Sequence, residues 1–283
     1  MNSKTTRIHL RQTRSNTMYR LLAIDLDGTL LTPRPRKIIT PRTRAVLQRA
    51  AEAGIAIVIA TGQTHAMLRH LCADLPLRGP QIIENGAIIV ENESGNILHE
   101  QLLPAEYILP VLSTLHDAGL YRAYHLRERV YVDRQTPRAH IWYPPPLSPP
   151  VEVDDVASLY PLPCIKVVGV GEERTLPEQR RAFEQLFQGK LYVTQSSFDL
   201  VEFLHPAVSK SNALRAIAAD LHITPAEIVA IGDSHNDMGM ITFAGLGVAM
   251  GNAPDEVKAV ADYVTLSNAA EGVAAVIEQF VLR

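Results

Sequence analysis

The chain has 283 residues, of which 47% are hydrophobic and 20% charged, and its formal net charge is −3. This balance is typical of a globular protein with room for one large domain or two smaller ones. The negative net charge argues against a nucleic-acid-binding protein, which would need a positive one. No apolar run approaches the roughly 20 residues of a membrane-spanning helix.

Two features bear on the cellular compartment. Cys72 and Cys164 fit no metal or redox spacing, so we expect buried thiols in a reducing cytoplasm. Residues 1–17 are basic and contain no acidic residue. They resemble a transit peptide in this respect, but we favour a disordered extension or a true start at Met18. We expect a monomer or a small homo-oligomer.

The first predicted element is an apolar run over residues 21–24 that ends in Asp25. A run of this kind predicts a strand buried on both faces of a parallel sheet. Asp27, Gly28 and Thr29 follow directly. In open parallel sheets the chemistry gathers at the carboxyl ends of the strands, and a carboxylate placed there needs a metal or a lysine to balance its charge.

Alternating helices and strands follow this first strand. Thr40 and Pro41 predict a helix start, as N-cap and first helical residue. Residues 55–60 read as a second buried strand that stops at Thr61 and Gly62, and a helix over 65–73 precedes a short strand at 82–83. This order is typical of a doubly wound, Rossmann-like parallel sheet in an α/β fold.

The pattern changes after Asn85 and Gly86, where strands mixed with two helices predict a separate α+β module. The first pattern returns with a helix over 209–221 and a buried strand over 228–231. We therefore predict a core of residues 18–88 and 201–283, interrupted by an inserted cap over 89–200.

Polar residues follow the predicted strands at several places. Asp25 and Asp27 end the first strand, Thr61 follows the second, and Lys210 opens the helix after the insert. Asp233, Asn236 and Asp237 follow the strand over 228–231. Carboxylates with an asparagine make an oxygen-rich set that suits Mg²⁺. A carboxylate beside a metal and a lysine can attack phosphorus, since both cations neutralise the phosphoryl oxygens.

These motifs together resemble the haloacid dehalogenase superfamily of phosphatases. The segments that carry the resemblance are 25–30 (DLDGTL), 60–62 (ATG), Lys210 and 232–238 (GDSHNDM). Segments 85–87 (NGA) and 245–253 (GLGVAMGNA) are similar to the Cof-type members, and the resemblance spans most of residues 18–283. Thr61 to Lys210 is 149 positions, which places an α/β cap between the second and third motifs, as in those relatives.

The resemblance implies a role for each matched residue. Asp25 is the nucleophile that forms an aspartyl-phosphate, and Asp27 protonates the leaving alcohol and then activates water. Thr61 and Lys210 hold the phosphoryl oxygens. Mg²⁺ is bound by Asp25, the main-chain carbonyl of Asp27, and Asp233, while Asn236 and Asp237 orient metal waters and Lys210, with Asp237 as an alternative direct ligand. Substrate contacts are implied for Thr61, Gly62, Asn85, Lys210 and Asn236.

The insert should supply the specificity residues, and the candidates are Arg122, His125, Arg127, His140 and Trp142. For each of them we favour the simpler interpretation of an ordinary surface or core residue. Three residues depart from the usual family pattern. Gln63 stands where relatives often have arginine, Ser211 replaces a common glycine, and Glu84 replaces a common serine.

The predicted function is a Mg²⁺-dependent phosphatase that hydrolyses a small phosphorylated metabolite, such as a sugar phosphate. Two alternatives stay open. A phosphomutase or phosphotransferase would use the same intermediate, although mutase relatives usually carry the cap between the first two motifs. A receiver-like signalling module also combines Asp, Mg²⁺, Thr and Lys, but it lacks a second aspartate two residues later and has no long insert.

Overall fold

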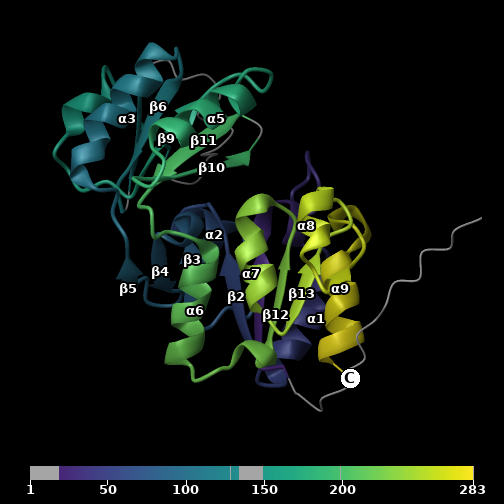
Figure 1. Ribbon diagram of the computed structural model, residues 1–283. Coiled ribbons are helices and arrows are strands. Elements are labelled where there is room, and N and C mark those ends of the chain that lie inside the picture. Colours follow the sequence, from purple (N-terminus) through teal and green to yellow (C-terminus); the bar gives the residue numbers. More distant parts are fainter. Residues whose placement is uncertain (1–18, 128, 134–148, 198, 283) are drawn as a thin grey trace, which may run out of the picture.

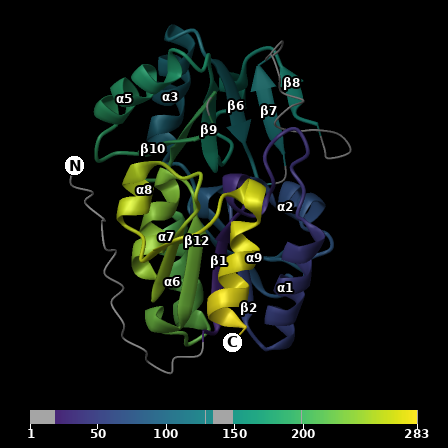
Figure 2. The ribbon, with the colours of Figure 1, turned by 90° about the vertical axis from the view of Figure 1, so that its right-hand side faces the viewer.

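The computed structural model describes residues 19–127, 129–133, 149–197 and 199–282 (Figure 1). The predictions for residues 1–17, and the candidates His140 and Trp142, lie outside these ranges. Within them the chain forms two sheets, each with its own helices, and Figure 2 shows one body seated above the other. The predicted α/β fold is confirmed.

The lower sheet is built around β1 (Leu21–Asp25), which pairs in parallel with β2 (Ala56–Ala60) and β12 (Ile228–Gly232). The parallel part continues through β13 (Leu246–Ala249) and β14 (Tyr263–Val264) on one side and β3 (Pro80–Ile83) on the other. Two antiparallel strands complete this edge, β4 (Ile88–Glu91) and β5 (Ile97–Glu100). Because β1, β2 and β12 run in parallel, their carboxyl ends meet at one edge.

Helices cover both faces of this sheet, as the alternation of side chains along β1 requires. Leu22 and Ile24 pack into the hydrophobic cluster that includes α1 and α9, whereas Leu21 and Ala23 pack into the cluster of α6 and Met240. The helices are α1 (Pro41–Glu52), α2 (His65–Leu71), α6 (Lys210–Asp220), α7 (Met238–Phe243), α8 (Asp255–Ala259) and α9 (Gly272–Val276). Thr40 caps α1 as predicted, because its side chain accepts a hydrogen bond from the Thr43 amide.

The upper body has a mixed sheet in the order β10-β11-β9-β6-β7-β8. Its strands are β6 (Tyr121–His125), β7 (Val130–Asp133), β8 (Val151–Val153), β9 (Lys166–Val170), β10 (Tyr192–Ser197) and β11 (Leu200–Leu204). Helices α3 (Ala105–Asp117) and α5 (Leu176–Leu186) cover one face through a cluster that includes Val167 and Phe203. The alternate residues of β9 and β11 therefore face the lower sheet.

Strand pairing moves both predicted domain boundaries. The insert was predicted to begin at residue 89, but β4 and β5 pair with β3 and extend the lower sheet to Glu100. The core was predicted to resume at residue 201, yet β11 pairs with β9 and β10 up to Leu204. Backbone hydrogen bonding decides both cases, and the sequence pattern contains no information on which sheet an isolated strand joins. No described helix has the length and apolar character needed to cross a membrane.

Candidate active site

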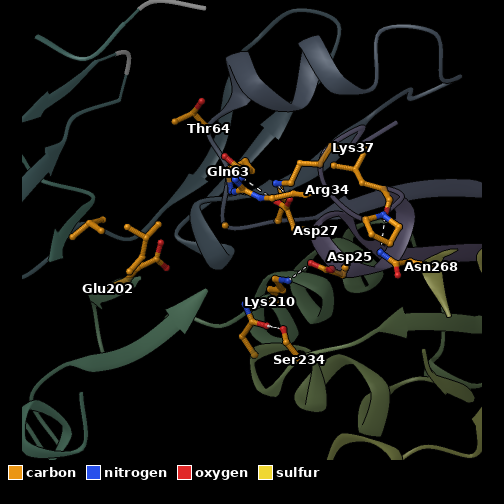
Figure 3. A pocket seen from close by; sticks show the side chains of 18 of the residues that line it. Asp25, Asp27, Arg34, Lys37, Gln63, Thr64, Glu202, Lys210, Ser234 and Asn268 are labelled. Atoms are coloured by element: carbon orange, nitrogen blue, oxygen red, sulfur yellow. Dashed lines mark hydrogen bonds and ion pairs between the residues drawn. The ribbon is translucent and has the colours of Figure 1, made fainter. Parts of the chain in front are cut away.

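A cavity of about 390 Å³ lies between the two sheets, at the carboxyl ends of the central strands. Its lower wall carries Asp25, Asp27, Thr61 and Lys210, and its upper wall comes from β6, β9 and β11. Figure 3 shows Asp25, Asp27 and Lys210 converging from separate elements. The structure thus brings together residues that are as much as 185 positions apart.

Asp25 and Lys210 form the buried centre of the lower wall. The Lys210 Nζ lies 2.6 Å from Asp25 Oδ1 and 2.7 Å from Asp237 Oδ1. Burial alone would lower the pKa of Lys210, but the charges of Asp237 and Asp25 outweigh it and raise that pKa. Lys210 is therefore a fixed cation in a site with more carboxylates than positive charges.

Asp25 Oδ2 is buried and has no hydrogen-bond partner among the described residues. Burial and the neighbouring charge of Asp237 raise the pKa of Asp25 well above its usual range, although Lys210 opposes this. Burial and Asp237 likewise raise the pKa of Asp233 to about 6. Both shifts arise first from burial and then from the neighbouring negative charge, and a bound cation would offset both effects by stabilising the ionised carboxylates.

The residues present fit a magnesium ion. Carboxylate oxygens of Asp25, Asp233 and Asp237 lie within 4.8 Å of one another, and oxygen ligands suit Mg²⁺. Asp237 is already occupied, because Oδ1 accepts from Lys210 and Oδ2 accepts from the amides of Asp233 and Ser234 at 3.0 Å each. Asp237 therefore holds Lys210 and the loop after β12.

Gly28 makes the close approach of Asp233 feasible. Its φ is +85°, and a Cβ there would lie 2.3 Å from Asp233 Oδ2. Thr29 Oγ1 donates to Asp233 Oδ1 at 2.8 Å, so the loop after β1 also orients this carboxylate. Asn252 and Asn268 also hold this loop, since their side-chain amides donate to the carbonyls of Gly28 and Leu31.

Asp27 lies beside the cavity with its side chain 31% exposed, so it can meet a ligand there. Lys37 Nζ lies 2.5 Å from Asp27 Oδ1, and Gln63 Nε2 donates to Asp27 Oδ2 at 2.9 Å. Gln63, one of the three residues that depart from the usual family pattern, therefore orients Asp27. Figure 3 shows Lys37 and Gln63 approaching Asp27 from different loops.

The loop after β2 presents Thr61 to the cavity. Thr61 Oγ1 accepts a hydrogen bond from the Gln63 amide at 3.1 Å, which leaves its hydroxyl hydrogen available to donate to a ligand. Gly62 allows Asn85 to approach, since a Cβ at Gly62 would lie 3.0 Å from Asn85 Oδ1. Asn236 Nδ2 donates to that same oxygen at 3.1 Å, so Asn85 and Asn236 support each other and Asn236 lines the cavity.

Three candidate specificity residues of the insert lie within the described residues, and only one of these three lines the cavity. His125 lines the cavity and lies 3.5 Å from Glu84. Arg122 does not line it, because its guanidinium is buried against Asp133 and Asp155 inside the upper body. Arg127 is 56% exposed and pairs with Glu100 on the outside. Arg122 and Arg127 are therefore an ordinary core residue and an ordinary surface residue, the interpretation that the sequence favours for each candidate.

Sequence reasoning missed Lys37, Lys166 and Glu202, all of which line the cavity. Lys166, which follows the apolar Ile165 and opens β9, and Glu202, in the middle of β11, are charged residues in otherwise apolar stretches. That interruption of an apolar run was the available signal for both. Lys37 lies in an irregular basic loop, where no sequence pattern marks it as a residue of the cavity.

Comparison with known proteins agrees with this geometry. A family model described as haloacid dehalogenase-like hydrolase matches residues 22–277. The sequence is 31% identical over 271 residues to a 5-amino-6-(5-phospho-D-ribitylamino)uracil phosphatase of Bacillus subtilis, covering 95% of this chain and 98% of the relative. It is 30% identical to a pyridoxal phosphate phosphatase of Escherichia coli, with 90% and 96% covered.

A solved structure shows the same arrangement in space. A haloacid dehalogenase-like hydrolase from Bacteroides thetaiotaomicron superposes with a TM-score of 0.80 at 31% sequence identity. The match covers 92% of this chain and 99% of that one. The similarity therefore includes both the core and the upper body.

Proposed function

The chain belongs to the haloacid dehalogenase-like hydrolases and is a phosphatase, and from this premise we propose a Mg²⁺-dependent reaction through an aspartyl-phosphate. The single observation that carries the proposal is the buried Asp25, held through one oxygen by Lys210 and open through the other. A carboxylate in this state is oriented for attack, and the adjacent ammonium can neutralise a phosphoryl oxygen.

In the first step, an Asp25 oxygen forms a bond to phosphorus while the bond from phosphorus to the leaving oxygen breaks. The leaving oxygen takes a proton from Asp27, which lies in the same cavity wall. In the second step, Asp27 takes a proton from water as that water attacks phosphorus. The bond from Asp25 to phosphorus breaks, which releases inorganic phosphate and restores the Asp25 carboxylate.

The remaining polar residues bind and orient the phosphoryl group. Thr61 donates its hydroxyl hydrogen, and Lys210 contacts an oxygen through its ammonium. Lys37 and Gln63 fix the direction of the Asp27 carboxyl. Asp25 and Asp233, with the main-chain carbonyl of Asp27, would hold Mg²⁺, which supplies further neutralisation of the phosphoryl oxygens when bound.

The cavity size supports a small phosphorylated metabolite, a sugar phosphate or a compound of similar size. At about 390 Å³ it lies at the small end of ligand pockets, which typically span ~300–1,000 Å³. Val168 and Leu200 contribute apolar surface to the upper wall, beside the polar His125 and Glu202. A leaving group with one apolar face and several hydrogen-bonding groups fits that wall. The two relatives are named for phosphates that carry a heterocyclic ring.

We also propose that the protein acts in the cytoplasm. Cys72 and Cys164 are both free thiols with buried side chains. Such thiols are the usual state in a reducing compartment.

The test is phosphate release from a panel of sugar phosphates, pyridoxal phosphate and ribityl-type phosphates, measured with and without Mg²⁺. We expect release by the wild type only with Mg²⁺, and a loss of about a thousandfold or more in Asp25→Asn, because no nucleophile remains. Asp74→Asn is the matched control, since Asp74 is 69% exposed on the surface. Full activity in Asp25→Asn, or an isomerised sugar phosphate in place of free phosphate, would contradict the proposal.

A further inference from the structure

A cluster of buried charges joins the upper body to the core beside the active site. Lys166, the first residue of β9, is 2% exposed, and its side chain crosses from the upper sheet to the core. Its Nζ lies 2.8 Å from Glu84 Oε2, 3.0 Å from Glu202 Oε1 and 2.9 Å from the Gly62 carbonyl oxygen. Glu84 and Gly62 belong to the core, whereas Glu202 comes from β11.

This cluster is costly to bury, so its placement needs a reason. A buried ammonium and two buried carboxylates lose their hydration, and an apolar contact would hold two domains together at lower cost. Burial alone would raise the pKa of Glu84, but the charges of Lys166 and His125 outweigh it and lower that pKa to about 2. Glu84 thus remains ionised near neutral pH, with the Lys166 Nζ 2.8 Å from its Oε2.

The ammonium completes a row of contacts along the phosphate-binding loop. The Thr61 carbonyl accepts from the Asn85 amide at 2.9 Å, and the Gln63 carbonyl accepts from the Glu84 amide at 3.1 Å. The carbonyl between them, that of Gly62, accepts from Lys166. Two of three consecutive carbonyls are therefore held by the core, and the middle one is held by the inserted domain.

A second branch of the cluster reaches the loop after β12. Glu202 accepts a hydrogen bond from Asn85 Nδ2, and Asn85 Oδ1 accepts one from Asn236 Nδ2. Glu84 and Asn85 have φ values of +50° and +60°, a backbone conformation that is held only where surrounding contacts stabilise it. Lys166 and Glu202 supply such contacts from the upper body.

We propose that Lys166 is a positioning residue, which acts through the Gly62 carbonyl to set the phosphate-binding loop when the inserted domain is seated. The inference rests on the proposed function, because it assigns phosphate binding to Thr61. In this arrangement the loop takes its binding geometry only with the upper body in place. Cap closure and phosphate binding are then one coupled event.

The experiment compares Lys166→Met with Arg127→Met, which also removes an ion pair between the upper body and the core, but on the exposed side. The measurements are kcat and KM for p-nitrophenyl phosphate, the inhibition constant of inorganic phosphate, and Tm. For Lys166→Met we expect kcat to fall about ten- to a hundredfold, the scale of a small misplacement of a binding group. The phosphate inhibition constant should rise by about tenfold. Arg127→Met should change neither.

A second variant separates positioning from charge balance. Lys166→Met leaves two buried carboxylates without their cation, whereas Lys166→Met/Glu84→Gln keeps the summed charge of the three residues at the wild-type value. We expect this double variant to show a near wild-type Tm with kcat still reduced. Wild-type kcat and phosphate inhibition in the double variant would overturn the inference. An inactive wild type would instead overturn the proposed function.

Discussion

Asp25 and Lys210 illustrate how single residues in this site depend on one another. Each is nearly fully buried, and neither charge would be stable there without the other. Asp237 shares Lys210 and also anchors two backbone amides, so it organises the loop after β12 as well as the lysine. The orientation of Asp233 depends in turn on the absence of a side chain at Gly28.

Gly28→Ala tests this last dependence, with Gly54→Ala as its matched control. Both glycines have nearly the same φ, +85° and +83°, but only Gly28 has a neighbour that a Cβ would strike. Each variant should lose about 1 kcal/mol of unfolding free energy from backbone strain. Gly28→Ala alone should also raise the Mg²⁺ concentration for half-maximal activity, by about tenfold or more, because Asp233 is displaced. An unchanged Mg²⁺ requirement would contradict this account of Gly28.

At the scale of elements, the junction between β2 and β3 holds the loops that carry Thr61 and Glu84. The pairing of these strands is short, with Ala60 opposite Ile82. The side chain of Gln81 extends it, because Oε1 accepts from the Ile59 amide at 2.8 Å and Nε2 donates to the Ile57 carbonyl at 3.1 Å. Gln81 is fully buried, so water cannot replace these bonds.

Gln81→Leu should therefore lower the free energy of unfolding by about 2–4 kcal/mol, since one donor and one acceptor are left buried without partners. Urea denaturation measures this change. Gln48→Leu is the control, because Gln48 is exposed on α1 and bonds only Glu52 within its own helix. An equal loss in both variants would mean that the Gln81 bonds contribute nothing specific.

At the scale of the whole molecule, the two bodies meet through charges as well as through the cavity that they enclose. In this contact Glu84 belongs to the core, whereas its partners Lys166 and His125 belong to the upper body. The folded protein lowers the pKa of Glu84 to about 2, against 4.5 for the free group. Its contribution to stability is therefore fully present above about pH 4.5 and is lost as the pH falls towards 2.

The pH dependence of unfolding tests this statement. Wild type should exceed Glu84→Gln in unfolding free energy by on the order of 3 kcal/mol at pH 7, the free-energy equivalent of this pKa difference. The gap should narrow as the pH falls from about 4.5 towards 2, because Glu84 takes up a proton in the unfolded chain before it does so in the folded protein. Glu93→Gln, at an exposed glutamate, should show no such trend. A gap that is constant with pH would argue that packing, and not charge, accounts for the role of Glu84.

Much of the core and of its polar edge could be predicted from local patterns. The apolar runs before Asp25, Thr61 and Asp233 predicted buried parallel strands, and all three runs are strands of one sheet. Since parallel strands end at a common edge, residues far apart in sequence could be placed together without knowing any contact. The same reasoning failed for β4 and β5, because a hairpin after a parallel strand can join either sheet.

Local patterns along the chain were sufficient to predict the fold class, the interruption of the core by an insert, and the convergence of Asp25, Lys210, Asp233 and Asp237. These predictions follow from hydrophobic periodicity and from residue types at strand ends, which are local properties. Two further contacts became visible only in the folded protein. Lys37 and Gln63 hold Asp27, and Lys166 reaches the carbonyl of Gly62, 104 positions away. Such contacts depend on how an irregular loop is directed and how one body sits on the other, and no periodic pattern encodes either.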